Sequence, residues 1–125
     1  MLHLAYAWLV LHLALRAGTA AGLVWSSIAT HALTLGAVGG MVIGMMTRTG
    51  RGHTGRPLRA DRWDVAAYAC VALAAIARVA LPALSPEWLR VAVGLSAVLW
   101  SAGFTIYLLR EGSWLMAPRA DGRPG

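Results

Sequence analysis

The sequence predicts an all-α protein, a polytopic transmembrane bundle of about four membrane-spanning helices. Of its 125 residues, 58% are hydrophobic and only 13% are charged, and its mean hydropathy is positive. Four stretches carry almost no charge over the ~20 residues that cross a hydrocarbon core. Because that core offers no water to unpaired backbone groups, these spans should be helices rather than isolated strands.

The first predicted span runs from about residue 2 to 23 and is interrupted only by Arg16, whose long side chain can extend toward a headgroup region. No Lys or Arg precedes Arg16, which favours a retained helix over a signal peptide. The second span, about residues 29 to 47, holds no charged residue and ends at Arg48.

The third predicted span covers residues 65 to 84 and contains Arg78. Pro82 and Pro86 fall where a helix should end and a turn begin. The fourth covers residues 89 to 109 and is closed by Arg110 and Glu111. The remaining residues, 116 to 125, are rich in Pro, Gly and Arg and are predicted to be a disordered cytoplasmic tail.

Arginines are distributed unevenly between the two sides of this predicted bundle. One side has mainly Arg16 and Arg90. The other has the loop between the second and third spans and the tail, with Arg48, Arg51, Arg56, Arg59, Arg62, Arg110, Arg119 and Arg123. The positive-inside rule therefore predicts a multi-pass protein with both termini cytoplasmic.

This topology accounts for the net charge of +6, so we expect no nucleic-acid partner, although so basic a chain would otherwise suggest one. The expected partner is the lipid bilayer. Cys70 is the single cysteine, so no internal disulfide can form. No nucleophile with its base and no phosphate-binding loop is present, so the sequence leaves open whether the protein is an enzyme.

Small residues recur every four positions in the second span, at Ala32, Gly36, Gly40 and Gly44. They stack along one side of a helix and let another helix backbone approach closely. The pattern predicts a packing surface, either for other helices or for a homo-oligomer.

The histidines are the residues most suited to metal chemistry, because neutral imidazole binds haem iron and copper. His31 begins the second span and His53 lies in the predicted loop, while His3 and His12 lie on opposite sides of the first span. For each, a hydrogen-bonded packing role is at least as good an interpretation as metal binding.

Two further sets of side chains could contact a cofactor. Met41, Met45 and Met46 offer thioethers for copper but equally fill apolar space. The arginines beside His53 could hold propionates or lipid headgroups through charge-assisted hydrogen bonds; they are Arg51, Arg56 and Arg59.

Three segments of the chain carry a resemblance to a known family. They are HALTLGAVGGMVIGMMTRTGRGHTGRPL at residues 31 to 58, LHLAYAW at residues 2 to 8 and ARVALPAL at residues 77 to 84. The most specific pieces are HALT, MMTR and GHTGRPL. In this order they resemble the C-terminal part of the NnrS family, bacterial polytopic membrane proteins containing haem and copper.

The resemblance implies a role in tolerating or metabolising nitric oxide during nitrosative stress and denitrification, in the bacterial inner membrane. It makes His31 and His53 candidate metal ligands and His3, Arg51 and Arg56 further candidate cofactor contacts. Members of this family have many more spans than four. The chain is therefore expected to be a fragment, a truncated product or one half of a split protein, and missing N-terminal helices would be its partners.

Two alternatives stay open beside a haem and copper protein. Arg78, a charge inside the third span, would suit a transporter or channel element. A helix bundle without chemistry would use its small-residue repeat only for packing.

Overall fold

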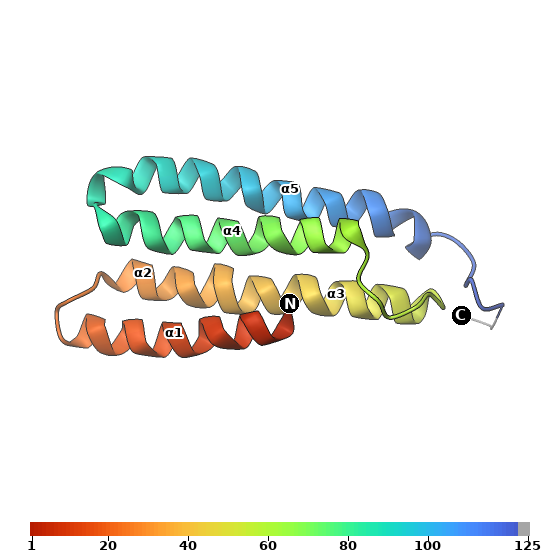
Figure 1. Ribbon diagram of the computed structural model, residues 1–125, viewed down its shortest axis with the longest axis horizontal. Helices are drawn as coiled ribbons and strands as arrows, with labels where there is room; N and C mark the ends of the chain where they lie inside the picture. The colour runs from red at the N-terminus through yellow and green to blue at the C-terminus, as the bar shows by residue number, and fades with distance from the viewer. Residues whose placement is uncertain (123–125) are drawn as a thin grey trace.

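The computed structural model describes residues 1–122 as two antiparallel helical hairpins packed side by side (Figure 1). One hairpin pairs α1 with a long helix made of α2, the π-helical segment η1 and α3, and the other pairs α4 with α5 through the 3₁₀ turn η2. The elements are α1 (Leu2–Ala20), α2 (Ser26–His31), η1 (Ala32–Gly39), α3 (Gly40–His53), α4 (Arg62–Leu84), η2 (Pro86–Trp88) and α5 (Leu89–Leu115).

The predicted all-α class is confirmed, and three helices are long and apolar enough to cross a membrane. They are Ser26–His53, Arg62–Leu84 and Pro86–Leu115, with 28, 23 and 30 residues. Helix α1 forms as predicted, but it is not among the three, because two histidines and Arg16 lower its hydropathy. The sequence predicted four spans where length and composition support three.

Two helices extend past the membrane spans predicted from the sequence. Helix α3 continues to His53, beyond the span predicted over residues 29 to 47, and α5 continues to Leu115, beyond the span predicted over residues 89 to 109. The apolar window marks where a helix crosses hydrocarbon, but backbone hydrogen bonding continues into the polar region beyond it. The connecting loop is therefore only residues 54–61, and His53 is the last residue of α3 rather than part of the loop.

Helix α4 begins at a capping box. Asp61 Oδ1 accepts hydrogen bonds from the backbone N–H of Trp63 at 2.8 Å and of Asp64 at 3.2 Å. Asp64 Oδ2 in turn accepts from the backbone N–H of Asp61 at 2.8 Å. This reciprocal pair satisfies free N–H groups of the first turn and sets the point where the chain enters α4.

The C-terminal segment lies against this loop. The backbone N–H of Ala120 donates to the carbonyl of Thr54 at 3.0 Å, so the last described residues lie at the same end of the bundle as loop 54–61. We call this end the loop end. Of the tail predicted to be disordered, residues 123–125 lie outside the described residues.

Small residues fill the interior of the bundle, and larger apolar side chains point outward. Fully buried alanines include Ala5, Ala32 and Ala74, whereas Leu84 is 81% exposed and Leu109 is 77% exposed. This inversion is typical of membrane helices, because small interior residues allow close helix contact and the outer surface meets lipid rather than water.

The small-residue repeat packs against α1 of the same chain. A Cβ on Gly36 would collide with the Trp8 ring, and one on Gly40 would lie 3.2 Å from Ala5. In an α-helix, residues four positions apart differ in direction by about 40° around the helix axis. The wider turns of the π-helical segment η1 reduce this angular offset. The packing surface predicted from the repeat is occupied by α1, so a homo-oligomer using it would require α1 to move.

We expect Gly36→Ala to destabilise the bundle by about 1 to 3 kcal/mol, because the added methyl group overpacks the contact with Trp8. Thermal unfolding in detergent, followed by circular dichroism, measures the effect. Gly94→Ala is the matched control, since nothing lies within 4 Å of its added Cβ and alanine favours a helix. Equal unfolding temperatures for the two variants would contradict the packing role.

Candidate functional site

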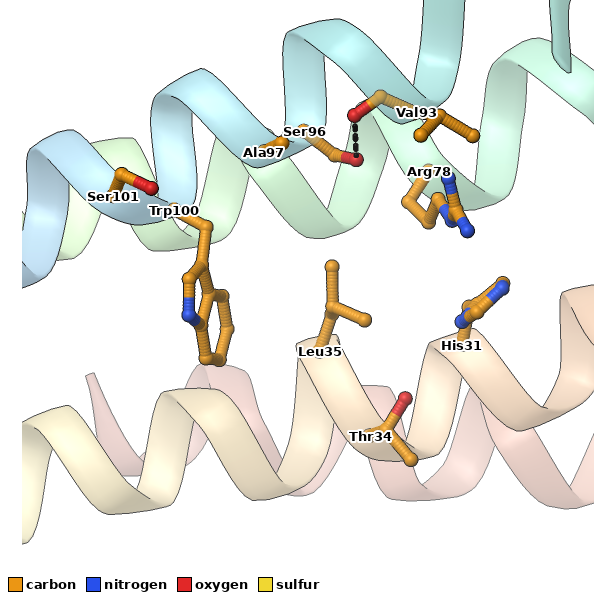
Figure 2. A pocket seen from close by; sticks show the side chains of 9 residues that line it. All are labelled: His31, Thr34, Leu35, Arg78, Val93, Ser96, Ala97, Trp100 and Ser101. Carbon is orange, nitrogen blue, oxygen red and sulfur yellow. Dashed lines mark hydrogen bonds between the residues drawn. The ribbon is translucent and has the colours of Figure 1, made fainter. Parts of the chain in front are cut away.

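A pocket of about 440 Å³ opens between the two hairpins, near the end of the bundle opposite the loop end. Its polar lining comes from the long helix, α4 and α5 (Figure 2); these residues are His31, Thr34, Arg78, Ser96, Trp100 and Ser101. We call it the His31 pocket. In this pocket, a histidine and an arginine from different helices line the same space.

His31 and Arg78 extend toward each other from opposite sides of this pocket (Figure 2). His31 is the last residue of α2, immediately before η1, and π-helical turns often occur at functional sites. Arg78 is half-buried, and within residues 1–122 no carboxylate pairs with it. The pocket therefore combines an imidazole, a cation without an acidic partner and the oxygen atoms of nearby hydroxyl groups.

Hydroxyl hydrogen bonding in the pocket is mostly local. Ser96 Oγ donates to the carbonyl of Val93 at 3.0 Å (Figure 2), and Thr34 Oγ1 donates to the carbonyl of Thr30 at 3.0 Å. Their oxygens keep free lone pairs, whereas the guanidinium of Arg78 keeps free donors. The pocket can therefore bind an anionic group at Arg78 and supply the imidazole of His31 as one ligand to a metal.

His53 lines a separate hollow of about 330 Å³ at the loop end, together with Met45, Met46, Gly50 and Tyr107. We call it the His53 hollow. His31 and His53 are separated by 22 residues of one continuous helix, which places them roughly 30 Å apart. One metal ion cannot bind both, and no group of three His, Cys, Asp or Glu side chains fit for a metal occurs in the described residues.

The two histidines of α1 lie away from both cavities. His3 is exposed. His12 Nδ1 lies 2.7 Å from the carbonyl oxygen of Ala29, a contact that fastens α1 to α2. The packing role that the sequence left open for each histidine therefore applies to His12.

Arg51, a predicted cofactor contact, is the centre of a buried ion-pair cluster at the loop end. Its Nη2 atom lies 2.5 Å from Asp64 Oδ2 and 3.1 Å from Asp61 Oδ2. Its Nη1 atom donates to the carbonyl of Pro57 at 3.4 Å, and its Nε atom lies 3.8 Å from Glu111 Oε1. Protein groups thus engage most of this guanidinium, which leaves it little capacity for cofactor carboxylates.

At the same end, three arginine side chains stack over the ring of Trp114. The guanidinium carbons of Arg51, Arg56 and Arg110 lie 5.1, 4.6 and 4.5 Å from the ring centroid. Arg56, the other predicted contact, is half-buried by this stacking, and Arg59 is exposed. Cation–π contacts of this kind stabilise partly desolvated arginines.

Sequence reasoning missed the acidic members of this cluster. The spacing of Asp61 and Asp64 before an apolar run is the signal of a capping box and could have located two of them. Nothing in the sequence indicated that Glu111 or Trp114 would meet Arg51, because the contact depends on where α5 crosses α3.

Asp61 carries a strongly lowered pKa. Burial opposes its ionisation, but hydrogen bonds from Arg110, from the backbone of Asp64 and Trp63 and from Arg51 more than compensate. A carboxyl whose folded pKa is lowered stabilises the fold above its ordinary pKa, and this contribution is lost as the pH falls.

A protein-family model described as NnrS protein matches residues 1–119. The chain belongs to the NnrS family. No match is found among curated proteins or among solved structures.

The motifs that resemble the NnrS family fall at both cavities. HALT, at residues 31 to 34, contributes His31 and Thr34 to the His31 pocket. MMTR and GHTGRPL, at residues 45 to 48 and 52 to 58, supply the methionines and the histidine of the His53 hollow.

We expect Asp61→Asn to lower the unfolding free energy at neutral pH by about 1 to 2 kcal/mol, since asparagine keeps the helix cap but loses charge-assisted bonds to Arg51 and Arg110. The variant should also lose less stability than the wild type as the pH falls below roughly 4. Unfolding measured from pH 7 to pH 3 tests both effects. Glu87→Gln, which changes an exposed carboxyl, is the control, and an unaltered acid profile in Asp61→Asn would contradict the assignment.

Proposed function

We propose that this NnrS-family membrane protein binds haem and copper and acts in the response to nitric oxide. The observation that carries the proposal is the pairing of His31 with Arg78 in one pocket between the hairpins. The family's association with nitric-oxide stress supplies the physiological part of the proposal.

The donor set of the His31 pocket fits haem. Haem iron needs only one protein imidazole as an axial ligand, and His31 provides one. The guanidinium of Arg78 is free to hold a propionate by charge-assisted hydrogen bonds, and Leu35 and Trp100 supply apolar contacts. Bound haem would supply an iron centre for nitric oxide, while these residues orient the group and exclude water.

The His53 hollow fits copper rather than haem. Imidazole and thioether are the soft ligands that Cu(I) prefers, and His53, Met45 and Met46 all line this hollow. Since His53 and His31 lie far apart on one helix, the two metals would occupy separate sites. A second copy or further helices, such as those of a longer protein, would supply the remaining ligands.

We also place the protein in the bacterial inner membrane with its termini on the cytoplasmic side. Loop 54–61 and the described C-terminal residues share the loop end, and the arginines gather there. The positive-inside rule supports this orientation.

We expect protein purified from membranes in detergent to show a Soret absorption band that His31→Ala abolishes, because the axial ligand is lost. His3→Ala serves as the control, since His3 is exposed and lines neither cavity. A wild-type spectrum without the band, or a band that survives His31→Ala, would refute haem binding at this pocket.

Copper content provides an independent prediction. His53→Ala should remove most of the bound copper while leaving the haem absorbance unchanged, because the two histidines are far apart. Elemental analysis of the same preparations measures this, and His12→Ala, if folded, should retain copper. Simultaneous loss of both metals from His53→Ala would argue for one shared site.

Arg78, which has no acidic partner within residues 1–122, also favours a second candidate, an element that passes anions through the membrane. Proteoliposomes that take up nitrite, lose this flux in Arg78→Leu and contain neither metal would support transport over haem binding. Protein with neither metal nor flux would support a helix bundle that only packs.

A further inference from the structure

Glu111 on α5 is a buried carboxyl group that no hydrogen bond satisfies. The residue is 1% exposed and is among the largest fully buried side chains. Both of its carboxyl oxygens are buried without a hydrogen-bond partner among the residues that the structure describes. A buried carboxylate ordinarily accepts several hydrogen bonds, so an unsatisfied one requires an explanation.

The nearest cation is already engaged by other acids. Arg51 directs Nη2 at Asp61 and Asp64 and Nη1 at the carbonyl of Pro57. Only its Nε atom faces Glu111, at 3.8 Å from Oε1, without forming a hydrogen bond. Glu111 therefore lies beside a guanidinium group whose two terminal nitrogens already donate to Asp61, Asp64 and the carbonyl of Pro57.

The charges of the ion-paired groups do not balance if every acid is ionised. Two guanidinium groups, of Arg51 and Arg110, face three carboxyl groups, of Asp61, Asp64 and Glu111. A buried charge without adequate pairing is costly, and such a group takes up a proton instead. Glu111 is the deepest and least bonded of the three, so the proton belongs there.

A route to water lies beside Glu111. A Cβ on Gly50 would lie 2.5 Å from Glu111 Oε2 and 3.6 Å from the phenol oxygen of Tyr107, so both groups approach the same point of α3. Gly50 and Tyr107 also line the His53 hollow, where His53 is exposed. Tyr107 thus lines the hollow while its hydroxyl approaches the same point of α3 as the carboxyl group, and this hydroxyl can both donate and accept a hydrogen bond.

We propose that Glu111 is a proton-binding site, a neutral carboxylic acid that exchanges its proton with water at the loop end through Tyr107 and the His53 hollow. Ionisable groups inside membrane proteins commonly mark proton pathways. The proposal does not depend on haem or copper binding. The titratable and charged groups facing the site come from every packed element; they are Arg51 and His53 of α3, Asp61 of the loop, Asp64 and Tyr68 of α4, and Tyr107 and Arg110 of α5.

Infrared spectroscopy of the purified full chain in lipid nanodiscs tests the site. At neutral pH the wild type should show the carbonyl stretch of a protonated carboxyl group, Glu111→Gln should lose it and Glu87→Gln should keep it. Glutamine has the shape of the neutral acid, so Glu111→Gln should unfold at or above the wild-type temperature. A missing band, a band removed by Asp64→Asn but not by Glu111→Gln, or a variant that fails to fold would each overturn the proposal.

Exchange with water is measured on the same sample. Transfer into D2O should shift the carboxyl band to lower frequency, and Tyr107→Phe should slow that shift at least tenfold while the band itself remains. A band that never shifts, or a shift equally fast in Tyr107→Phe, would overturn the proposed route.

Discussion

The ion pairs of Arg51 hold the loop end of this protein together. One guanidinium at the end of α3 contacts the cap of α4, the carbonyl of Pro57 in the loop and the neighbourhood of Glu111 on α5. Because Arg51 is only 7% exposed, removing either aspartate would leave buried charge poorly compensated. The packing of loop 54–61 between α3 and α4 therefore depends strongly on this one residue.

Polar chemistry is separated along the long helix. At one end, the His31 pocket has a cation, Arg78, with which no carboxylate of the described residues pairs. At the loop end, the ion pairs join three carboxyl groups to two guanidinium groups. Apart from Thr34, the π-helical segment η1 between them is apolar, and its small residues pack closely against α1. This separation keeps the cation of the His31 pocket away from the carboxyl groups of the loop end, which would otherwise neutralise it.

Much of the site depends on small residues. A Cβ added on Gly50 would collide with the Glu111 carboxyl group, and one on Gly39 would lie 2.5 Å from the ring of Trp100. A Cβ on Gly103 would lie 3.0 Å from the carbonyl oxygen of Ala67 on α4. Gly50 and Gly39 leave out a side chain where a carboxyl or an aromatic group enters the interface, and Gly103 does so where α5 packs closely on α4. Gly50 lines the His53 hollow, and Gly39 makes room for Trp100, which lines the His31 pocket.

The sequence alone determined that the chain is an all-α membrane protein of the NnrS type, because low charge density and distinctive motifs are properties of the chain itself. It also placed the arginines of the loop and tail on one side. It predicted a fourth span over α1, which is not among the three candidate spans by length and composition. Its predicted spans end before α3 and α5 do, because hydropathy reports immersion in lipid rather than where backbone hydrogen bonding stops. Only the tertiary structure brought Arg78 to His31, separated His31 from His53 and placed Glu111 beside Arg51. Such contacts depend on the rotation and crossing of helices far apart in sequence, which local residue patterns do not specify.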